Sequence, residues 1–270
     1  MNVITPTFGT QLKRWRTLRR MSQLDLALEA EVSTRHLSFI ETGRSVPSRE
    51  MVLHLAEQLD IPHRERNTLL LAAGYAPEYR ERSLDDPEME SARRAIDLVL
   101  AGHEPFPALA FDRTWNMVAA NRMVSVFLDG IDERMLHPPL NVVRLSLHPD
   151  GLAPRIVNFA EWREHMLGRL RRQLDHTPDP ALADLLEEVR RYPAPEEEEA
   201  SPNAPDLGGI AIPLQLRTEH GVLSAISTTT VFGTPVDITL EELAIESFFP
   251  ADDQTAQVLR DAFEGIKGEE

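Results

Sequence analysis

The stretch 23–44 constrains the fold most, because its apolar residues recur at helical spacing on both sides of a sharp break. The two apolar stripes are formed by Leu24, Ala27 and Leu28 before the break and by Leu37 and Ile40 after it. We expect Val32 to fill the corner and the small Ala27 to let the second helix cross close to the first. Ser33 is placed to cap that second helix. The pattern predicts a helix-turn-helix.

The second predicted helix directs four side chains away from its buried stripe, namely Thr34, Arg35, Ser38 and Phe39. An arginine can donate two hydrogen bonds to a guanine, and a threonine or phenylalanine can contact the methyl group of a thymine. The helix carries no acidic residue before Glu41. This composition favours a helix that lies in the major groove of DNA, although a solvent-exposed helical hairpin in an ordinary bundle would share the spacing.

Residues 8–75 resemble the Xre, or lambda-repressor-like, DNA-binding domains. The residues that carry the resemblance are Ser22-Gln23, Leu26-Ala27, Val32-Ser33, Leu37-Ser38, Ile40-Glu41-Thr42-Gly43-Arg44 and Pro47-Ser48. The resemblance implies that Thr34 and Arg35 read bases and that Phe39 joins them. It also implies that Gln23 holds a DNA phosphate.

The resemblance further implies a buried pair of Arg16 and Glu41 that ties the first helix to the end of the recognition helix. The chain departs from the family at Glu31, where a turn glycine is usual. If the backbone is left-handed there, a side chain costs about 1 kcal/mol. Arg44 follows the recognition helix and is positioned to touch a phosphate. The full predicted DNA-binding set is Gln23, Ser33, Thr34, Arg35, Ser38, Phe39 and Arg44.

The net charge of −16 would be unexpected for a DNA-binding protein if it were evenly spread, but it is not. Residues 1–80 contain 11 Lys and Arg against 9 Asp and Glu, whereas residues 81–270 contain 17 against 35. All basic residues up to Arg20 precede the first acidic residue, Asp25. The basic end therefore coincides with the predicted DNA-binding domain, and the acidic remainder would be repelled by phosphates.

The chain has no cysteine, which excludes disulfides and thiolate metal sites and fits a reducing cytoplasm. Its first residues, MNVITPTFGTQLKRWR, contain no apolar run typical of a signal peptide. No stretch approaches the roughly 20 apolar residues of a membrane span. We therefore expect a soluble, cytoplasmic protein without a membrane segment.

The helical pattern predicts an all-α domain of five helices over residues 1–75. Residues 76–104 predict a polar linker and a connecting helix. Residues 105–264 predict a hairpin, then helices, and then four strands, at 210–217, 222–231, 236–239 and 243–249. The predicted fold class is α+β, with a mostly antiparallel sheet and flanking helices in the second domain.

Residues 105–264 resemble the ligand-binding domain of MmyB-like transcription regulators. The blocks that carry the resemblance are Pro107 to Leu109, Trp115 to Arg122, Asn141 to Arg144, Asn158 to Arg163, Thr228 to Pro235 and Glu242 to Asp252. The resemblance implies a PAS-like fold, in which an antiparallel sheet and helices across one face enclose a mostly apolar cavity. It also implies that the domain senses small, lipid-like molecules.

An elongated apolar cavity would bind an acyl chain by burial, which is worth roughly 0.8 kcal/mol for each methylene. The predicted lining residues are Trp115, Val118, Trp162, Met166 and Phe248. A carboxylate head would need donors at the cavity mouth, and the candidates are Asn121, Arg122 and Arg144. Each of these side chains could instead belong to an ordinary core or pair with surface acids.

Motifs for catalysis or metal binding are missing from the sequence, which has no HExxH, Walker loop or GxGxxG. A self-cleaving Ser–Lys pair would need a lysine in the second half, where only Lys267 in the tail is available. The histidines show no spacing typical of metal ligands. We therefore predict no catalytic residue, no metal and no cofactor.

These patterns lead to the hypothesis of a transcription regulator that binds a double-stranded DNA operator as a homodimer, since one recognition helix contacts too few bases for specificity. A small apolar ligand, a fatty acid or similar lipid, would control it. The first alternative is a protein-sensing, antitoxin-like regulator without a small-molecule ligand. The second is an enzyme with a DNA-binding appendage, which would need a polar cleft with a convergent acid, base and nucleophile.

Overall fold

The computed structural model describes residues 6–195, 211–233, 235 and 237–268 of the chain. It divides into two compact units. The first unit comprises the N-terminal residues up to Ser83 together with 234–241, and the second comprises 84–233 and the residues from Glu242 onward. The chain therefore contributes to the first unit twice.

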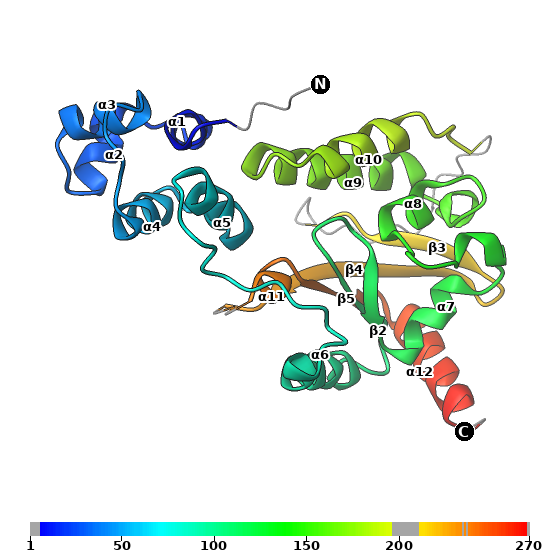
Figure 1. The fold of residues 1–270 in the computed structure, drawn as a ribbon. Coiled ribbons are helices and arrows are strands. Elements are labelled where there is room, and N and C mark those ends of the chain that lie inside the picture. The colour runs from blue at the N-terminus through cyan, green and yellow to red at the C-terminus, as the bar shows by residue number, and fades with distance from the viewer. Residues whose placement is uncertain (1–5, 196–210, 234, 236, 269–270) are drawn as a thin grey trace. The chain divides into compact units, whose positions relative to one another are not determined.

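The first unit is built from short helices (Figure 1), and the buried apolar residues of the N-terminal five form one cluster. Its helices are α1 (Phe8–Leu18), α2 (Gln23–Glu29), α3 (Thr34–Glu41), α4 (Arg49–Gln58), α5 (His63–Ala72) and, from later in the chain, α11 (Ile238–Glu241). The hydroxyls of Ser22, Ser33 and Ser48 each accept a backbone N–H and so cap α2, α3 and α4. The five N-terminal helices confirm the predicted all-α domain.

The apolar stripe predicted for α2 is wrong at two positions. Leu24 and Leu28 are 56% and 69% exposed, whereas Leu26 and Ala27 are buried. Helix α2 has only seven residues and therefore buries a single narrow face. Leu26, which the spacing analysis left out of the stripe, occupies the centre of that face.

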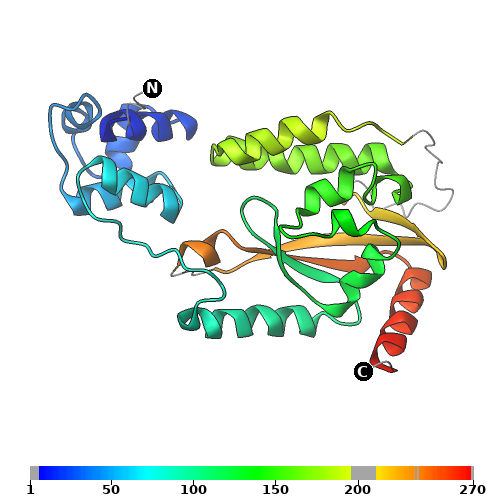
Figure 2. The same cartoon turned by 45° about the vertical axis from the view of Figure 1, so that its right-hand side comes forward.

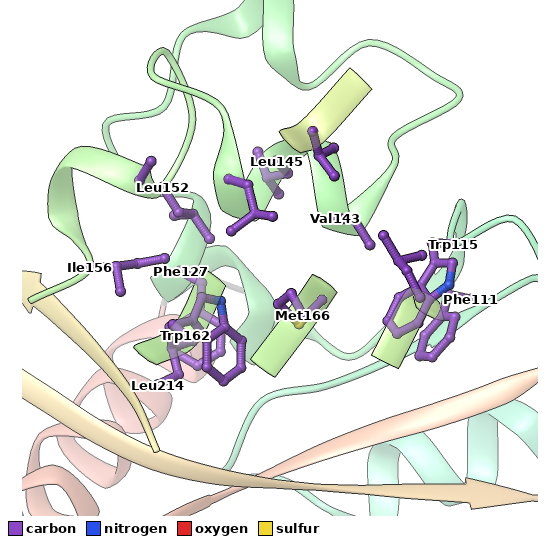
Figure 3. Packing of buried hydrophobic residues seen from close by; sticks show 14 of the residues in the cluster. Phe111, Trp115, Phe127, Val143, Leu145, Leu152, Ile156, Trp162, Met166 and Leu214 are labelled. Carbon is purple, nitrogen blue, oxygen red and sulfur yellow. The ribbon is translucent and has the colours of Figure 1, made fainter. Parts of the chain in front are cut away.

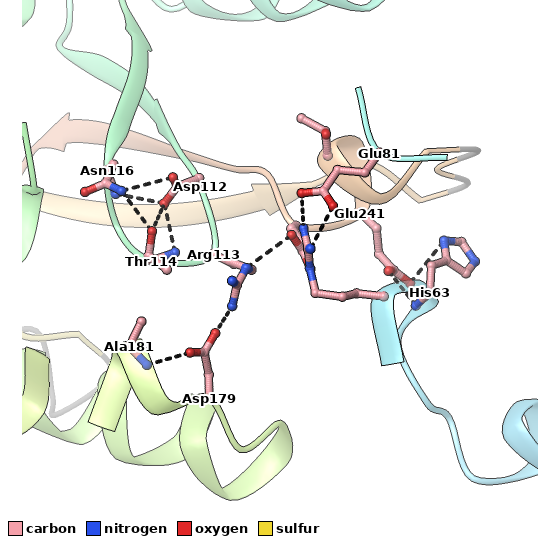
Figure 4. A network of polar contacts seen from close by, with 12 residues as sticks. His63, Glu81, Asp112, Arg113, Thr114, Asn116, Asp179, Ala181 and Glu241 are labelled. Atoms are coloured by element: carbon pink, nitrogen blue, oxygen red, sulfur yellow. Dashed lines mark hydrogen bonds and ion pairs between the residues drawn. The ribbon is translucent and has the colours of Figure 1, made fainter. Parts of the chain in front are cut away.

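The predicted strand at 236–239 is also wrong, because its described part leads into helix α11. Asp237 is buried and its carboxylate accepts the backbone N–H of Thr239 (2.9 Å), which favours a helical turn over an extended strand. At the other end of α11, the Glu241 carboxylate accepts the backbone N–H of His63 (2.8 Å; Figure 4). Helix α5 follows Pro62, which has no capping group, so Glu241 satisfies a donor that would otherwise lack a partner.

The second unit contains a five-stranded antiparallel sheet with the order β2-β1-β5-β4-β3. The strands are β1 (Ala108–Phe111), β2 (Met117–Ala120), β3 (Leu214–Thr218), β4 (Gly221–Val231) and β5 (Ala244–Pro250). The first hairpin and the later antiparallel strands match the sequence prediction in order. The architecture confirms the predicted α+β class with an antiparallel sheet and flanking helices.

Helices cover the sheet on both faces (Figures 1 and 2). They are α6 (Glu90–Gly102), α7 (Ser125–Leu128), α8 (Val142–Leu147), α9 (Phe159–His176), α10 (Pro180–Arg190) and α12 (Asp253–Gly268), with short 3₁₀ helices at Pro87–Met89, Arg122–Val124, Glu133–Met135 and Ala153–Arg155. Helices α8, α9 and α10 pack apolar side chains against one face of the sheet and form with it the large hydrophobic core of this unit. Helix α6 buries Ile96 and Leu100 against the other face. Helix α12 packs on β4, where the Thr255 hydroxyl accepts the backbone N–H of Ser224 (2.9 Å).

The turn between β1 and β2 is held by polar contacts (Figure 4). The Asp112 carboxylate accepts the backbone N–H of Thr114 (2.8 Å), a bond typical of tight turns. Arg113 in the same turn forms ion pairs with Asp179, which caps α10, and with Glu242 (3.5 Å), which lies just before β5. The turn therefore joins α10 to the start of β5 beside the large core.

Candidate DNA-binding and ligand-binding sites

Helix α3 directs the predicted base-reading residues to the surface. Thr34 and Arg35 are exposed, and Ser38 and Phe39 are half-buried next to them. The guanidinium of Arg35 lies 5.3 Å from the centroid of the Phe39 ring, in a cation–π contact that limits its rotamers. The opposite side of the helix is buried through Leu37, Ile40 and Glu41. The helix thus presents one continuous face of donors and apolar groups to solvent.

The corner before α3 depends on one backbone conformation. Glu31 has a φ of +52°, in the left-handed region that favours glycine. After it, the backbone N–H of Val32 donates to the carbonyl of Ala27 (2.9 Å) and closes the turn. Ser33 is exposed and its hydroxyl accepts the N–H of His36 (3.1 Å), so this residue holds the start of the recognition helix.

The ion pair implied by the Xre resemblance is present and buried. The Nε and Nη2 atoms of Arg16 donate to the two carboxylate oxygens of Glu41 at 2.6 and 3.0 Å, and Nη1 donates to the carbonyl of Met21 (2.8 Å). The hydrogen bonds to Glu41 raise the pKa of Arg16 above its ordinary value. Gln23, the predicted phosphate ligand, donates its amide to the same carboxylate (2.7 Å) and is half-buried.

Arg44 is exposed in the loop that follows α3. Its backbone N–H donates to the carbonyl of Phe39 (2.8 Å), so the loop folds back onto the end of the recognition helix. Exposed Thr34 and Arg35 therefore lie at the beginning of α3, and a further exposed cation lies just after its end. This arrangement can contact base edges and the phosphate backbone at once.

The second unit contains an apolar cavity of about 60 Å³. Its wall is built mainly from large apolar side chains, among them Phe127, Leu145, Leu152, Trp162, Met166 and Phe248. Two polar side chains also line it, Ser146 and Glu246. The indole N–H of Trp162 donates to the Ser146 hydroxyl (2.7 Å), which leaves the hydroxyl hydrogen free to point elsewhere.

Trp162, Met166 and Phe248, all predicted to line the cavity, are found in its wall. Trp115 instead stacks on Phe111 with ring centroids 4.7 Å apart (Figure 3). Its indole N–H donates to Gln173 (2.8 Å), and its backbone has a φ of +68°. Trp115 is therefore held in a rare conformation next to the cavity without bordering it.

Val118 on β2 was also predicted to line the cavity, but it does not border it and is 41% exposed.

The three predicted head-group residues are engaged in structural contacts. The buried amide of Asn121 donates to the carbonyls of Leu100 (3.1 Å) and Phe106 (2.8 Å). Arg122 pairs with Glu104 (3.2 Å). None of the three head-group residues borders the cavity.

Arg144, the third of these residues, forms a two-pronged ion pair with Glu188 at 2.8 and 2.7 Å. The pair raises the pKa of Arg144 and lowers that of Glu188, in each case chiefly through these hydrogen bonds. The hydroxyl of Tyr192 also donates to Glu188. Arg144 thus joins α8 to α10 on the outer side of the core.

Sequence analysis missed the charged pair at the cavity. Arg169 on α9 donates to Glu246 on β5 (2.7 Å) and to the hydroxyl of Thr229 (3.0 Å). The period-two pattern of β5 could have placed Glu246 on the same face as Phe248. It could not have shown that α9 brings an arginine to that carboxylate. Arg169 also borders an open depression of about 330 Å³ together with Arg172 and Gln173.

The described residues also bear on metal binding and membrane insertion. No group of three or more His, Asp or Glu side chains there is arranged to hold a metal ion. No helix in the same part of the chain is long and apolar enough to cross a membrane.

Comparison with known proteins identifies both halves of the chain. Residues 92–262 match the model of the MmyB-like transcription regulator ligand binding domain, which covers more than half of the chain. Residues 12–66 match a helix-turn-helix model and include α2, α3 and the turn between them. A search of curated proteins finds no match.

Proposed function

The chain belongs to the family of MmyB-like transcription regulators, and we propose that it binds a DNA operator as a homodimer under the control of a small apolar ligand. The observation that carries the proposal is the pairing of an exposed recognition face in one unit with an apolar cavity in the other. A helix-turn-helix with a ligand-binding domain makes the chain a ligand-regulated transcription regulator.

On the DNA side, Thr34 and Arg35 contact base edges, with Phe39 and Ser38 next to them in the major groove. Arg44, Gln23 and the Ser33 end of α3 approach the phosphate backbone. The side-chain amide of Gln23 already donates one N–H to Glu41. It therefore contacts a phosphate either through its second N–H or by giving up the bond to Glu41. One such helix reads a short half-site, which is why a homodimer on a pseudo-palindromic operator is proposed. The proposed site of action is the cytoplasm.

On the ligand side, a fatty acid or similar lipid, as expected from the sequence, would match the apolar character of the cavity wall. The cavity must expand to hold such a ligand, because its volume of about 60 Å³ is smaller than the roughly 150 Å³ of a cavity that holds benzene. Met117 and Met166 in the wall have flexible, unbranched side chains that can rearrange around a ligand. The proposed ligand therefore opens the cavity as it binds.

The DNA half of the proposal is tested with Arg35→Ala on an operator selected from random duplexes. The substitution should weaken binding by about 1–3 kcal/mol and relax the base preference at one position of each half-site. Arg93→Ala removes the same charge from an exposed position on α6 and should leave affinity unchanged. Equal losses for Arg35→Ala on operator and random DNA would contradict base reading by Arg35.

The ligand half is tested by solvent extraction of the purified full-length protein followed by mass spectrometry. The proposal predicts a stoichiometric, mainly apolar small molecule that exchanges into the protein again. A co-purifying protein in place of any such molecule would favour the protein-sensing alternative and contradict the ligand.

A further inference from the structure

One wall residue of the cavity, Glu246, belongs to a buried ion pair with Arg169, and this pair restricts the polar group that a ligand can carry. Glu246 faces the cavity from β5, between its cross-strand neighbours Leu109 and Thr229. Its side chain is 6% exposed, and that of Arg169 is 14% exposed. Among the described residues that line the cavity, Glu246 is the only charged one.

The two partners of the pair differ in how fully they are satisfied. Arg169 donates to Glu246 and Thr229 and lies 4.6 Å from the centroid of the Trp115 ring, so its charge has a counter-ion and an aromatic face. Glu246 accepts the bond from Arg169 through Oε1. Its other oxygen, Oε2, accepts no hydrogen bond within the described part of the chain. Oε2 is not among the fully enclosed atoms without a partner, so a donor from a ligand can reach it.

The charges of Arg169 and Glu246 cancel, and this neutral pair favours a lipid that ends in a hydroxyl over one that ends in a carboxylate. A ligand carboxylate would bring a second negative charge close to Glu246 in apolar surroundings, with Arg169 already paired. A hydroxyl brings no charge and donates the hydrogen bond that Oε2 lacks.

We propose that the ligand is an uncharged amphiphile with a hydroxyl at its buried end, and that Glu246 selects it over the corresponding carboxylate. Glu246 is thus a specificity-determining residue. The inference rests on the proposed control by an apolar ligand and narrows the class of lipid. Arg169 has a positioning role, because it holds the Glu246 carboxylate in the cavity wall and neutralises it.

The test compares 1-decanol with decanoate, which share one chain length and differ in the end group. Binding of each to the full-length protein is measured by calorimetry at neutral pH. Decanol should bind about tenfold more tightly, the effect of one hydrogen bond to a charged group. Because an alcohol is also more hydrophobic than its carboxylate, the decisive quantity is how the ratio of the two dissociation constants changes between variants.

Glu246→Gln leaves the charge of Arg169 without a counter-ion and should shift the ratio at least about tenfold toward decanoate. Arg169→Gln leaves the charge of Glu246 unpaired and should shift the ratio of the two dissociation constants in the opposite direction, toward decanol. Glu164→Gln, on the exposed side of α9, changes the net charge equally and should leave the ratio as in the wild type.

Decanoate binding as tightly as decanol, or a ratio that Glu246→Gln leaves unchanged in a folded protein, would overturn the selection by Glu246 while leaving the apolar ligand intact. Binding of neither probe to a protein that still binds its operator would overturn the proposed ligand control, and this inference with it.

Discussion

Glu31 has a side chain where the backbone turn favours glycine, with a φ of +52°. Because a left-handed conformation costs a side chain about 1 kcal/mol, Glu31→Gly should stabilise the first unit by about that amount. Urea unfolding followed by circular dichroism measures the change.

The control for this substitution is Lys13→Gly in the middle of α1, an exposed position with ordinary helical geometry. Glycine there should destabilise the same unit by about 1 kcal/mol, since it loses helix propensity without relieving strain. If both substitutions destabilised the unit, the turn at Glu31 would not be strained as described.

His165 gives the second unit a pH dependence. It stacks on Trp162 in the cavity wall with ring centroids 5.4 Å apart, and burial lowers its pKa from the ordinary value of about 6.5. The unfolded chain therefore takes up a proton before the folded chain does, so this contribution to stability is lost as the pH falls below about 6.5. His165→Gln should flatten the fall in unfolding free energy between neutral and acidic pH. A slope identical to that of the wild type would show that other groups cause it.

At the scale of elements, one carboxylate joins three helices of the first unit. Glu41 at the end of α3 accepts hydrogen bonds from Arg16 on α1 and Gln23 on α2. Glu41→Ala would leave the guanidinium of Arg16 buried without its counter-ion, so the first unit should lose about 3 kcal/mol of stability. Thermal unfolding of the full chain measures this loss.

An exposed ion pair provides the comparison. Glu90 and Arg94 pair at 2.8 Å on α6, but both side chains are more than two-thirds exposed. Glu90→Ala should therefore cost well under about 1 kcal/mol. A similar loss for Glu41→Ala would mean that burial of the Arg16–Glu41 pair contributes little.

The sequence was sufficient for elements whose signals are local. Ser33, the apolar residues Leu37 and Ile40, and the exposed residues of α3 all follow from capping and helical period. Leu24 and Leu28 were misplaced because a seven-residue helix fits several apolar stripes, and only packing selects one.

The ligand site was less predictable, because its decisive contacts join distant segments. Arg169 and Glu246 are separated by 77 residues and meet only once α9 lies across the sheet. Conversely, Arg144 looked available for a carboxylate head but is paired with Glu188, 44 residues away. Composition and period indicated an apolar interior, whereas the partner of each charged side chain depended on tertiary structure.

In the whole molecule, the DNA-binding unit and a strand of the cavity wall are connected directly along the polypeptide chain. The segment 237–241 joins β4 to β5 but belongs to the DNA-binding unit, where Glu241 caps α5. Strand β5, which carries Glu246 and Phe248 into the cavity wall, follows directly. A change in β5 on ligand binding would therefore act on residues continuous with the helix-turn-helix unit.

The central claim is that the cavity and the operator site are linked, and one thermodynamic cycle tests it. Operator affinity is measured with and without saturating ligand, and ligand affinity with and without operator, using the extracted molecule or 1-decanol. Linkage requires both ratios to equal one common factor, expected to lie between about 5 and 150. An operator affinity that does not change at saturating ligand would contradict the account.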